Sequence, residues 1–313
     1  MMSLLQLLMK PLAIVSSISC WSSRNVARRL LPFLMMLALH RSVLPLFNST
    51  DMGTIDISYF SLGIGLLLLL VPIYYVWRYE TKLLKSICVG AVRMVVQMIF
   101  IGIYLRYLFE WDNPVINCLW VLVMVYIAAE TAITRTKVRR SILMVPLVVG
   151  FVVASVLIGL YFLGVVLQLN NVFSAQYFIP IMGILLGNML SVNVIAVGTF
   201  YSTLQREQNL YYYLLGNGAS RSEALQPFVR QAIVKAFSPA IANMAVMGLV
   251  SLPGTMIGQI LGGSSPNVAI KYQIMIVVVT MSASMLSLII AINLSTKQAF
   301  DGYGRMRQVM KGN

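Results

Sequence analysis

Residues 205–239, QREQNLYYYLLGNGASRSEALQPFVRQAIVKAFSP, form the longest polar stretch of a chain that is otherwise almost continuously apolar. Gly218 can take a positive φ angle at little cost, so we expect it to end a helix over residues 204–215. Ser220, with Glu223 three residues later, has the pattern of a capping box and predicts that a second helix begins there. The stretch is therefore expected to form two helices joined by a glycine hinge, an arrangement suited to docking a soluble motor protein.

The composition on either side of this stretch is that of a membrane protein. Of 313 residues, 59% are hydrophobic and 10% are charged, and the mean hydropathy is +0.85. A water-soluble domain of this length could not bury so much apolar surface. The net charge of +14 does not indicate nucleic acid, because the basic residues lie in short clusters between apolar runs. We expect an all-α integral membrane protein that contacts the lipid bilayer.

Seven apolar runs are long enough to cross about 30 Å of hydrocarbon as helices. The runs cover residues 57–77, 86–109, 115–133, 142–167, 176–200, 239–261 and 272–294. Fifteen of the 23 basic residues lie in residues 78–85, 135–140, 205–235 and the tail from 297, whereas the opposite loops hold Arg106 and Lys271. The positive-inside rule therefore predicts about seven transmembrane helices, with the N-terminus outside and the C-terminus in the cytoplasm.

Residues 1–51 differ from the rest of the chain. They are basic and rich in serine, and their second apolar run contains His40 and Arg41, which are costly in lipid. Three interpretations stay open: a signal-like or disordered extension, an interfacial helix, or translation from a wrong start, with Met52 as the true initiator. The expected organisation is a dispensable extension over residues 1–51 and a seven-span domain over residues 52–313, with a cytoplasmic loop at 205–238.

Motifs for catalysis are missing from the sequence. It contains no G-x-x-x-x-G-K-[ST] loop, no HExxH, no Ser/His/Asp arrangement and no paired carboxylates within a span. Its three cysteines and single histidine match no metal site, and its twenty methionines are ordinary filler of apolar helices. We expect no enzymatic activity, no cofactor and no resident metal in this chain, so any uphill transport needs a gradient or a partner.

The stretch MGLVSLPGTMIGQILGG, residues 247–263, interrupts the sixth apolar run. Pro253 removes a helical hydrogen bond and is flanked by Ser251 and Gly254. A proline kink, with Gly254, Gly258 and Gly262 at a close helix contact, is the favoured interpretation. Direct contact with a transported substrate is the alternative.

Small and polar residues in other runs suit either helix packing or a path across the membrane. Gly187, Asn188 and Ser191 cluster in IPIMGILLGNMLSVNVIAVG (179–198), and Ser284 and Ser287 share one face of the last run. Packing is the favoured explanation for both groups. The complete set of candidate path residues is Arg93, Gln97, Glu130, Asn188, Ser191, Asn243, Ser251, Pro253, Gly254, Ser284 and Ser287.

Arg93 and Glu130 are ionisable residues within the apolar runs. Charges at such positions are expensive and are usually paired or functional. We favour snorkelling toward the headgroups, or an Arg93–Glu130 ion pair that fixes the bundle.

Several motifs carry a resemblance to a known family. NGASRSEAL (217–225) is similar to the coupling loop of ATP-binding-cassette permeases. RMVVQMIFIG (93–102), IPIMGILLGNML (179–190), GLVSLPGTMIG (248–258) and AIKYQIMI (269–276) resemble the FetB-type iron-export permeases of bacteria and their plant aluminium-tolerance relatives. The resemblance covers about residues 57–296, and GLVSLPG and KYQIM are its most specific parts.

The resemblance implies a multi-pass permease subunit of the bacterial cytoplasmic membrane that exports iron or another metal cation. Its implied partners are a second copy of itself and a FetA-like cytoplasmic ATPase, which would bind ATP and Mg. The implied ATPase-coupling residues are Leu215, Gly218, Ala219, Ser220, Glu223 and Ala224.

One departure from the family pattern concerns the substrate. The family often has an aspartate and a lysine shortly before GLVSLPG, whereas SPAIANMAVMG (238–248) has Ala242 and Ala245 there and leaves Asn243 as its strongly polar side chain. Substrate identity therefore does not carry over directly. The alternatives are a permease for another metal or a nucleotide sugar, and a gradient-driven secondary transporter.

Overall fold

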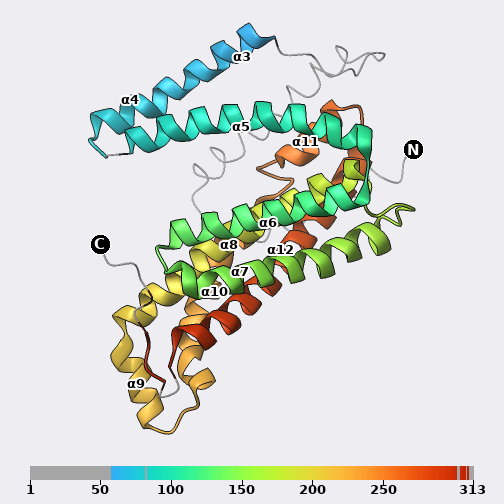
Figure 1. Ribbon diagram of the computed structural model, residues 1–313. Coiled ribbons are helices and arrows are strands. Elements are labelled where there is room, and N and C mark those ends of the chain that lie inside the picture. Colours follow the sequence, from blue (N-terminus) through green and yellow to red (C-terminus); the bar gives the residue numbers. More distant parts are fainter. Residues whose placement is uncertain (1–57, 82, 302–303, 308, 310–313) are drawn as a thin grey trace, which may run out of the picture. The chain divides into compact units, whose positions relative to one another are not determined.

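The computed structural model describes residues 58–81, 83–301, 304–307 and 309, all within the second of two compact units, residues 54–313. The expectations for residues 1–51 lie outside these residues. Every regular element among the described residues is a helix (Figure 1), which confirms the all-α fold. The helices are α3 (Tyr59–Leu66), α4 (Leu70–Arg78), α5 (Leu84–Trp111), α6 (Pro114–Thr136), α7 (Arg140–Ala154), α8 (Ala175–Arg206), α9 (Gln208–Gly216), α10 (Arg221–Val246), α11 (Gly254–Leu261) and α12 (Pro266–Ala299). A short 3₁₀ helix, η4 (Leu67–Leu69), joins α3 to α4, and two π-helical segments, η5 (Ser155–Gly159) and η6 (Tyr161–Val166), continue α7.

Six helical stretches in the described part of the chain are long and apolar enough to cross a membrane. They are Phe60–Arg78, Leu84–Trp111, Pro114–Thr136, Arg140–Val166, Ala175–Arg206 and Pro266–Ala299. They match six of the seven runs that the sequence predicts. The remaining run, residues 239–261, is divided between the end of α10 and α11.

The division of this run is a true break, not the proline kink that the sequence favoured. The chain leaves the helical conformation at Met247, and Gly248 follows with a φ of +84°. The Gly248 N–H donates to the Ser251 carbonyl oxygen over 2.9 Å, which closes a tight turn. Pro253 then precedes the first residue of α11 and has no N–H to continue a helical ladder. Two residues that tolerate or require non-helical backbone therefore interrupt the helix together.

The core is formed where α6, α7, α8, α10 and α12 pack together. Gly150 of α7 lies against α12 so closely that a Cβ there would be 2.8 Å from the Ser287 backbone oxygen. Across α8 and α12, the buried Asn193 side-chain NH₂ donates to Ser287 Oγ over 2.9 Å. Small residues at close contacts and amides that bond between helices are typical of helix association in membranes.

Helices α3 to α5 contribute little to this core. In α5 and in the Phe60–Arg78 span, the most apolar stretch of 18 residues contains no buried residue. Leu108, near the end of α5, is the one residue of that helix that belongs to the core. The far end of α5 is fixed by Asp112, whose Oδ1 accepts a hydrogen bond of 2.6 Å from the Ala175 N–H. Nearby, the Asn117 side chain donates to the Phe173 carbonyl oxygen over 2.9 Å. The α5–α6 turn is thereby joined to the beginning of α8.

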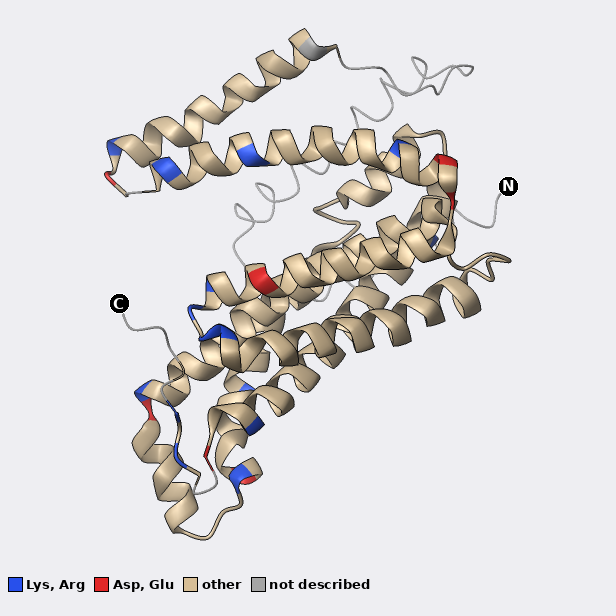
Figure 2. Ribbon diagram, viewed as in Figure 1, with Lys and Arg blue, Asp and Glu red and all other residues tan. Residues whose placement is uncertain are grey.

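Charged residues lie mostly toward the ends of the helices, and the helix middles are nearly free of them (Figure 2). This pattern is expected of helices whose middle turns contact hydrocarbon. Six of the seven predicted membrane helices are thus present in the described part of the chain, while the orientation across the bilayer stays a prediction.

Candidate functional site

The candidate site begins where α8 gives way to α9. The sequence predicts one helix over residues 204–215, but α8 ends at Arg206 and α9 begins at Gln208, with Glu207 at a φ of −111° between them. The bend allows Tyr211, with 1% of its surface exposed, to pack on Phe300 near the C-terminus, with ring centroids 5.3 Å apart. A contact with a segment distant in sequence therefore overrides a continuous helical pattern. We call residues 208–224 the elbow.

The hinge of the elbow has the geometry that the sequence predicts. Gly218 has a φ of +87°, and its N–H donates to the Leu215 carbonyl oxygen over 3.0 Å. The next N–H, that of Ala219, donates to the Leu214 carbonyl oxygen over 3.1 Å. These two bonds form a Schellman motif, which ends a helix with glycine in the left-handed conformation.

The capping box that the sequence predicts at Ser220 is also present. Ser220 Oγ accepts from the Glu223 N–H over 3.4 Å, and Glu223 Oε2 accepts from the Ser220 N–H over 2.8 Å. The Ser220 hydroxyl also donates to the same carboxylate over 2.7 Å. These hydrogen bonds from Ser220 lower the pKa of the Glu223 carboxyl. One helix thus stops and another starts within four residues.

The six predicted coupling residues divide into a tip and its support. Gly218, Ser220 and Glu223 are exposed, Leu215 and Ala219 are half-buried, and Ala224 is fully buried. The sequence reasoning missed Tyr212 and Tyr213, which are 41% and 68% exposed next to the tip. The available signal was the run of three tyrosines at 211–213, because three adjacent aromatic residues on a helix cannot all face the same side.

A C-terminal hairpin braces the elbow, and the sequence reasoning did not anticipate it. We use this name for residues 299–309, of which 302, 303 and 308 are not described. Phe300 pairs with Met306 in an antiparallel bridge, and the Arg307 N–H donates to the Ala299 carbonyl oxygen over 2.9 Å. Figure 1 shows the end of α12 running down beside α9. The sequence DGYG at 301–304 was the available signal, since Asp-Gly favours tight turns.

Besides the packing of Tyr211 on Phe300, three contacts hold the elbow to the hairpin. The buried Tyr211 hydroxyl donates to the Gly304 carbonyl oxygen over 3.1 Å, and burial raises the pKa of this phenol. Arg221 donates to the Asp301 carbonyl oxygen over 3.1 Å, and its guanidinium carbon lies 5.6 Å from the centre of the Phe300 ring. Both helices of the elbow, α9 and α10, are therefore tied to the same segment.

The hairpin also reaches the loop between α6 and α7. The Arg139 N–H donates to the Val309 carbonyl oxygen over 2.8 Å. Two loops that the charge pattern places on one side of the membrane thus meet through the C-terminus.

The described residues among the path candidates do not gather around one cavity. Ser284 and Ser287 are buried between helices, where the Ser287 hydroxyl donates to the Ser284 carbonyl oxygen over 3.0 Å and accepts from Asn193. This agrees with the packing role that the sequence favoured for the two serines. The sequence reasoning overlooked Asn193, although it is the polar residue of α8 that joins them.

The other small and polar candidates are exposed on separate helices. Asn188 and Ser191 of α8 bond to their own helix, donating to the Ile184 and Gly187 carbonyl oxygens over 2.9 and 3.0 Å. The remaining exposed candidates are Arg93 and Gln97 on α5, Asn243 on α10, and Ser251 and Gly254 at the break, where Pro253 is half-buried.

The ion pair expected between Arg93 and Glu130 is not formed. Glu130 lies instead with its Oε2 3.2 Å from an Arg140 nitrogen, and the same nitrogen donates to the Tyr126 hydroxyl over 2.9 Å. The contact with Glu130 is an ion pair without hydrogen-bond geometry. Arg140 is nearer because it begins α7, directly after the helix that carries Glu130.

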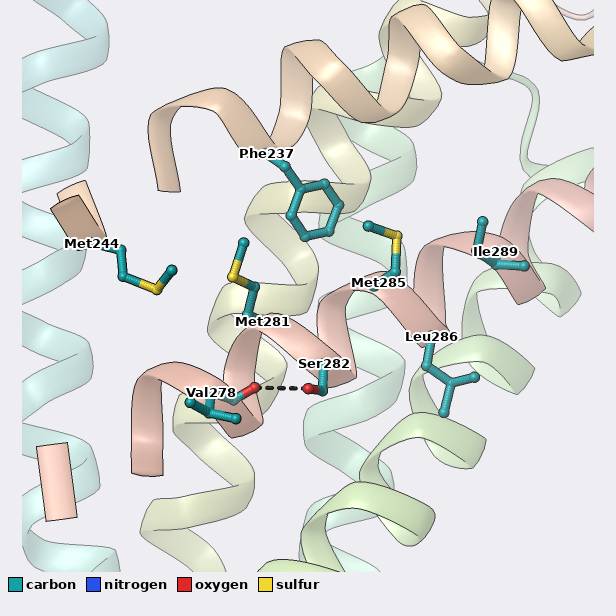
Figure 3. Close-up of a pocket in the computed structure, with 8 residues that line it drawn as sticks. All are labelled: Phe237, Met244, Val278, Met281, Ser282, Met285, Leu286 and Ile289. Atoms are coloured by element: carbon teal, nitrogen blue, oxygen red, sulfur yellow. Dashed lines mark hydrogen bonds between the residues drawn. The ribbon is translucent and has the colours of Figure 1, made fainter. Parts of the chain in front are cut away.

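A groove of about 570 Å³ opens between α10 and α12 (Figure 3). The residues that line it are Phe237, Met244, Val278, Met281, Ser282, Met285, Leu286 and Ile289. Its one hydroxyl, on Ser282, donates to the Val278 carbonyl oxygen over 2.9 Å. No charged residue lines the groove, and Met244 lies three residues before the break in α10. The helix that leaves the elbow thus forms one wall of this groove.

These features define an all-helical membrane protein with a braced loop outside its apolar helices. Residues 59–300 match the uncharacterised protein family UPF0014, and the chain belongs to this family. The resemblance that its motifs indicate is thereby confirmed.

Curated relatives come from bacteria and plants. The chain is 32% identical over 254 residues to the probable iron export permease protein FetB of Escherichia coli, covering 80% of this chain and 95% of that protein. It is 26% identical over 254 residues to the UPF0014 membrane protein YjkA of Bacillus subtilis, covering 80% and 98%. It is 33% identical over 198 residues to the protein ALUMINUM SENSITIVE 3 of Arabidopsis thaliana, covering 62% and 70%. No solved structure matches the chain.

Proposed function

We propose that this chain is the membrane permease subunit of an ATP-binding-cassette transporter and exports iron or another metal cation. In this proposal a separate cytoplasmic ATPase binds ATP and Mg, and two copies of the chain enclose the path. The relative named as a probable iron export permease supports the transport role. The observation that carries the proposal is the elbow, in which a Schellman motif and a capping box meet at an exposed tip.

The elbow is built to transmit force. Its tip is exposed, while Tyr211 and Arg221 fix the helices on either side to the C-terminal hairpin. A partner that moves the tip therefore moves α9 and α10 together instead of bending a free loop. Local changes become rigid-body motions where packed helices carry them.

Helix α10 gives this motion a direction. It runs for 26 residues from Ser220 to the break, which corresponds to about 39 Å. Its far end lines the groove at Met244 and then meets the tight turn at Gly248. A push at the elbow would thus widen or narrow the groove, while the break absorbs the displacement before α11.

The ligands available to a cation within the described spans are weak. No group of three or more His, Cys, Asp or Glu residues is close enough to hold a metal ion in the described part of the chain. Asn243 and the methionines of the groove remain as donors, and weak binding suits passage more than storage. With Ala242 and Ala245 in α10, the cation is proposed to cross without a carboxylate from that helix.

The test is reconstitution of the chain with its ATPase in vesicles loaded with metal. We expect about one ATPase per permease chain, and metal movement that requires ATP hydrolysis. Gly218→Val should leave ATP hydrolysis present but disconnect it from metal movement, whereas Gly216→Ala, a change within α9, should behave as wild type. Metal movement driven by an ion gradient without any ATPase would overturn the proposal in favour of a secondary transporter.

A further inference from the structure

The starting observation is Arg93, a charged residue within the apolar helix α5 that has no counter-charge among the described residues. Lys85 and Arg106 lie 21 residues apart on α5, about 32 Å, which is close to the hydrocarbon thickness of about 30 Å. Arg93 lies eight residues from Lys85, about 12 Å along the helix toward its centre. It is exposed and forms no ion pair or hydrogen bond with the residues that the structure describes. Such a charge in lipid is strongly unfavourable unless it is paired.

The matching anion is Glu130 of α6. It is the one acidic residue of the described spans that lies away from a helix end, and its side chain is 39% exposed. Its ion pair with Arg140 leaves acceptor capacity, because neither carboxylate oxygen accepts a hydrogen bond within the described chain. A second cation can therefore bind the same carboxylate.

The two residues lie at the same depth. Arg93 is eighteen residues before Trp111, and Glu130 is sixteen residues after Pro114. Measured from the short turn that joins these helices, the distances are about 27 and 24 Å. A twofold axis along the membrane normal keeps every residue at its depth, so it can bring Arg93 of one copy to Glu130 of another.

The surfaces around both residues are also complementary. Leu119, Leu122 and Tyr126 are 49–62% exposed and lie three or four residues apart, so they form one apolar stripe of α6 that leads to Glu130. On α5, Arg93 and Gln97 lie on one face with exposed apolar neighbours such as Val96 and Phe100. Neither stripe is covered by the described part of its own chain.

We propose that α5 of one copy packs along α6 of a second copy, so that Arg93 forms an ion pair with the partner's Glu130. This inference rests on the proposed function, which already requires two copies, and it assigns the surface through which they meet. The Arg140–Glu130 pair then becomes a three-membered cluster, repeated twice by the symmetry. In this cluster the Glu130 carboxylate lies between two guanidinium groups and offsets part of the charge of each.

The experiment is disulfide trapping in the membrane, with Cys20, Cys88 and Cys118 replaced by serine. One chain carries Arg93→Cys and a differently tagged chain carries Glu130→Cys, so that only contact between chains can produce a mixed dimer. We expect this dimer to form under mild oxidation. Val95→Cys, at the same depth but on the opposite face of α5, should trap at least about tenfold less. The inference would be overturned if Arg93→Cys and Glu130→Cys form no mixed disulfide while native mass spectrometry still shows two copies of the chain.

Two further measurements separate the alternatives. In a chain that carries both cysteines, a disulfide within one chain would show that α5 closes on its own α6, and would overturn the inference. In the protein with its native cysteines, Arg93→Glu should lower the fraction of dimer about tenfold or more, whereas Arg93→Lys should retain the wild-type fraction. If both variants dimerise equally, Arg93 only snorkels to the headgroups and the inference is overturned. Binding of the ATPase and ATP-dependent metal movement are measured in parallel. If the wild-type protein neither binds the ATPase nor moves metal in the presence of ATP, the proposed function fails, whatever the result for the dimer.

Discussion

Replacing Gly218 tests the hinge of the elbow by backbone conformation alone. A Cβ added at Gly218 would meet no heavy atom within 4 Å, so no substitution there can act through a clash of its Cβ. The φ of +87°, however, is disfavoured for any residue with a Cβ. A series of Asn, Ala and Val at this position therefore changes one quantity, the free energy of the left-handed conformation.

The magnitudes follow from the geometry. An alanine in the left-handed conformation costs about 1 kcal/mol, and a β-branched valine costs about 2 kcal/mol or more, while asparagine is tolerated. Since about 1.4 kcal/mol corresponds to a tenfold change in an equilibrium constant, valine should reduce the population of the hinge with residue 218 in the left-handed conformation at least about tenfold. The carbonyl groups of Leu214 and Leu215 would then lose the hydrogen bonds of the Schellman motif.

Hydrogen exchange measures the hinge without reference to transport. We expect the Ala224 amide, which donates to the Ser220 carbonyl oxygen over 2.9 Å, to exchange faster in the order Asn, Ala, Val. Coupling of ATP hydrolysis to metal movement should fall in the same order. Gly216→Ala is the matched control, because that glycine also has open space around it but lies within α9. If asparagine were as damaging as valine, or if valine were harmless, the conformational argument would be refuted.

Three other predictions concern the brace, the cap and the core. The folded-state pKa of Glu223 lies below its ordinary value of 4.5, so the cap stabilises the elbow fully above pH 4.5 and this stabilisation is lost as the pH falls through the lowered pKa. Glu223→Gln should abolish this pH dependence, and hydrogen exchange of the α10 amides measures it. Tyr211→Phe removes one hydrogen bond, about 1 kcal/mol, and should expose the C-terminal hairpin to proteolysis, whereas Tyr213→Phe should not. Gly150→Ala should lower the thermal stability of the detergent-solubilised protein by about 1–3 kcal/mol because its Cβ would meet the backbone of α12, while Gly102→Ala, which meets nothing within 4 Å, should be neutral.

The features that the sequence predicted well are those with local causes. The length of each apolar run is set by the bilayer, and six runs appear as helices within a few residues of the expected bounds. Gly218 and Ser220 act through the backbone of their immediate neighbours, so the hinge and the cap can be identified from residue type and spacing. The break near Pro253 was located correctly, although it is wider than a kink.

The features that were missed depend on contacts between distant segments. The bend at Glu207 exists because Tyr211 packs on Phe300, about ninety residues later. Asn193 looks like its neighbour Asn188 in the sequence, and only packing distinguishes the buried amide from the exposed one. An Arg93–Glu130 ion pair was one of two interpretations that the sequence left open, and the structure pairs Glu130 with Arg140 instead, because a sequence shows depth along a helix but not which helices face each other.

The position of the C-terminal hairpin has a practical consequence for anyone who labels this protein. Gly304 is bound to Tyr211 of the elbow, and Val309 is bound to Arg139. A fluorescent protein or an affinity handle inserted between residues 304 and 307 would therefore sit beside the elbow, on the surface proposed for the ATPase. Such fusions are expected to express and to reach the membrane, yet to report a transporter that is blocked by its own label.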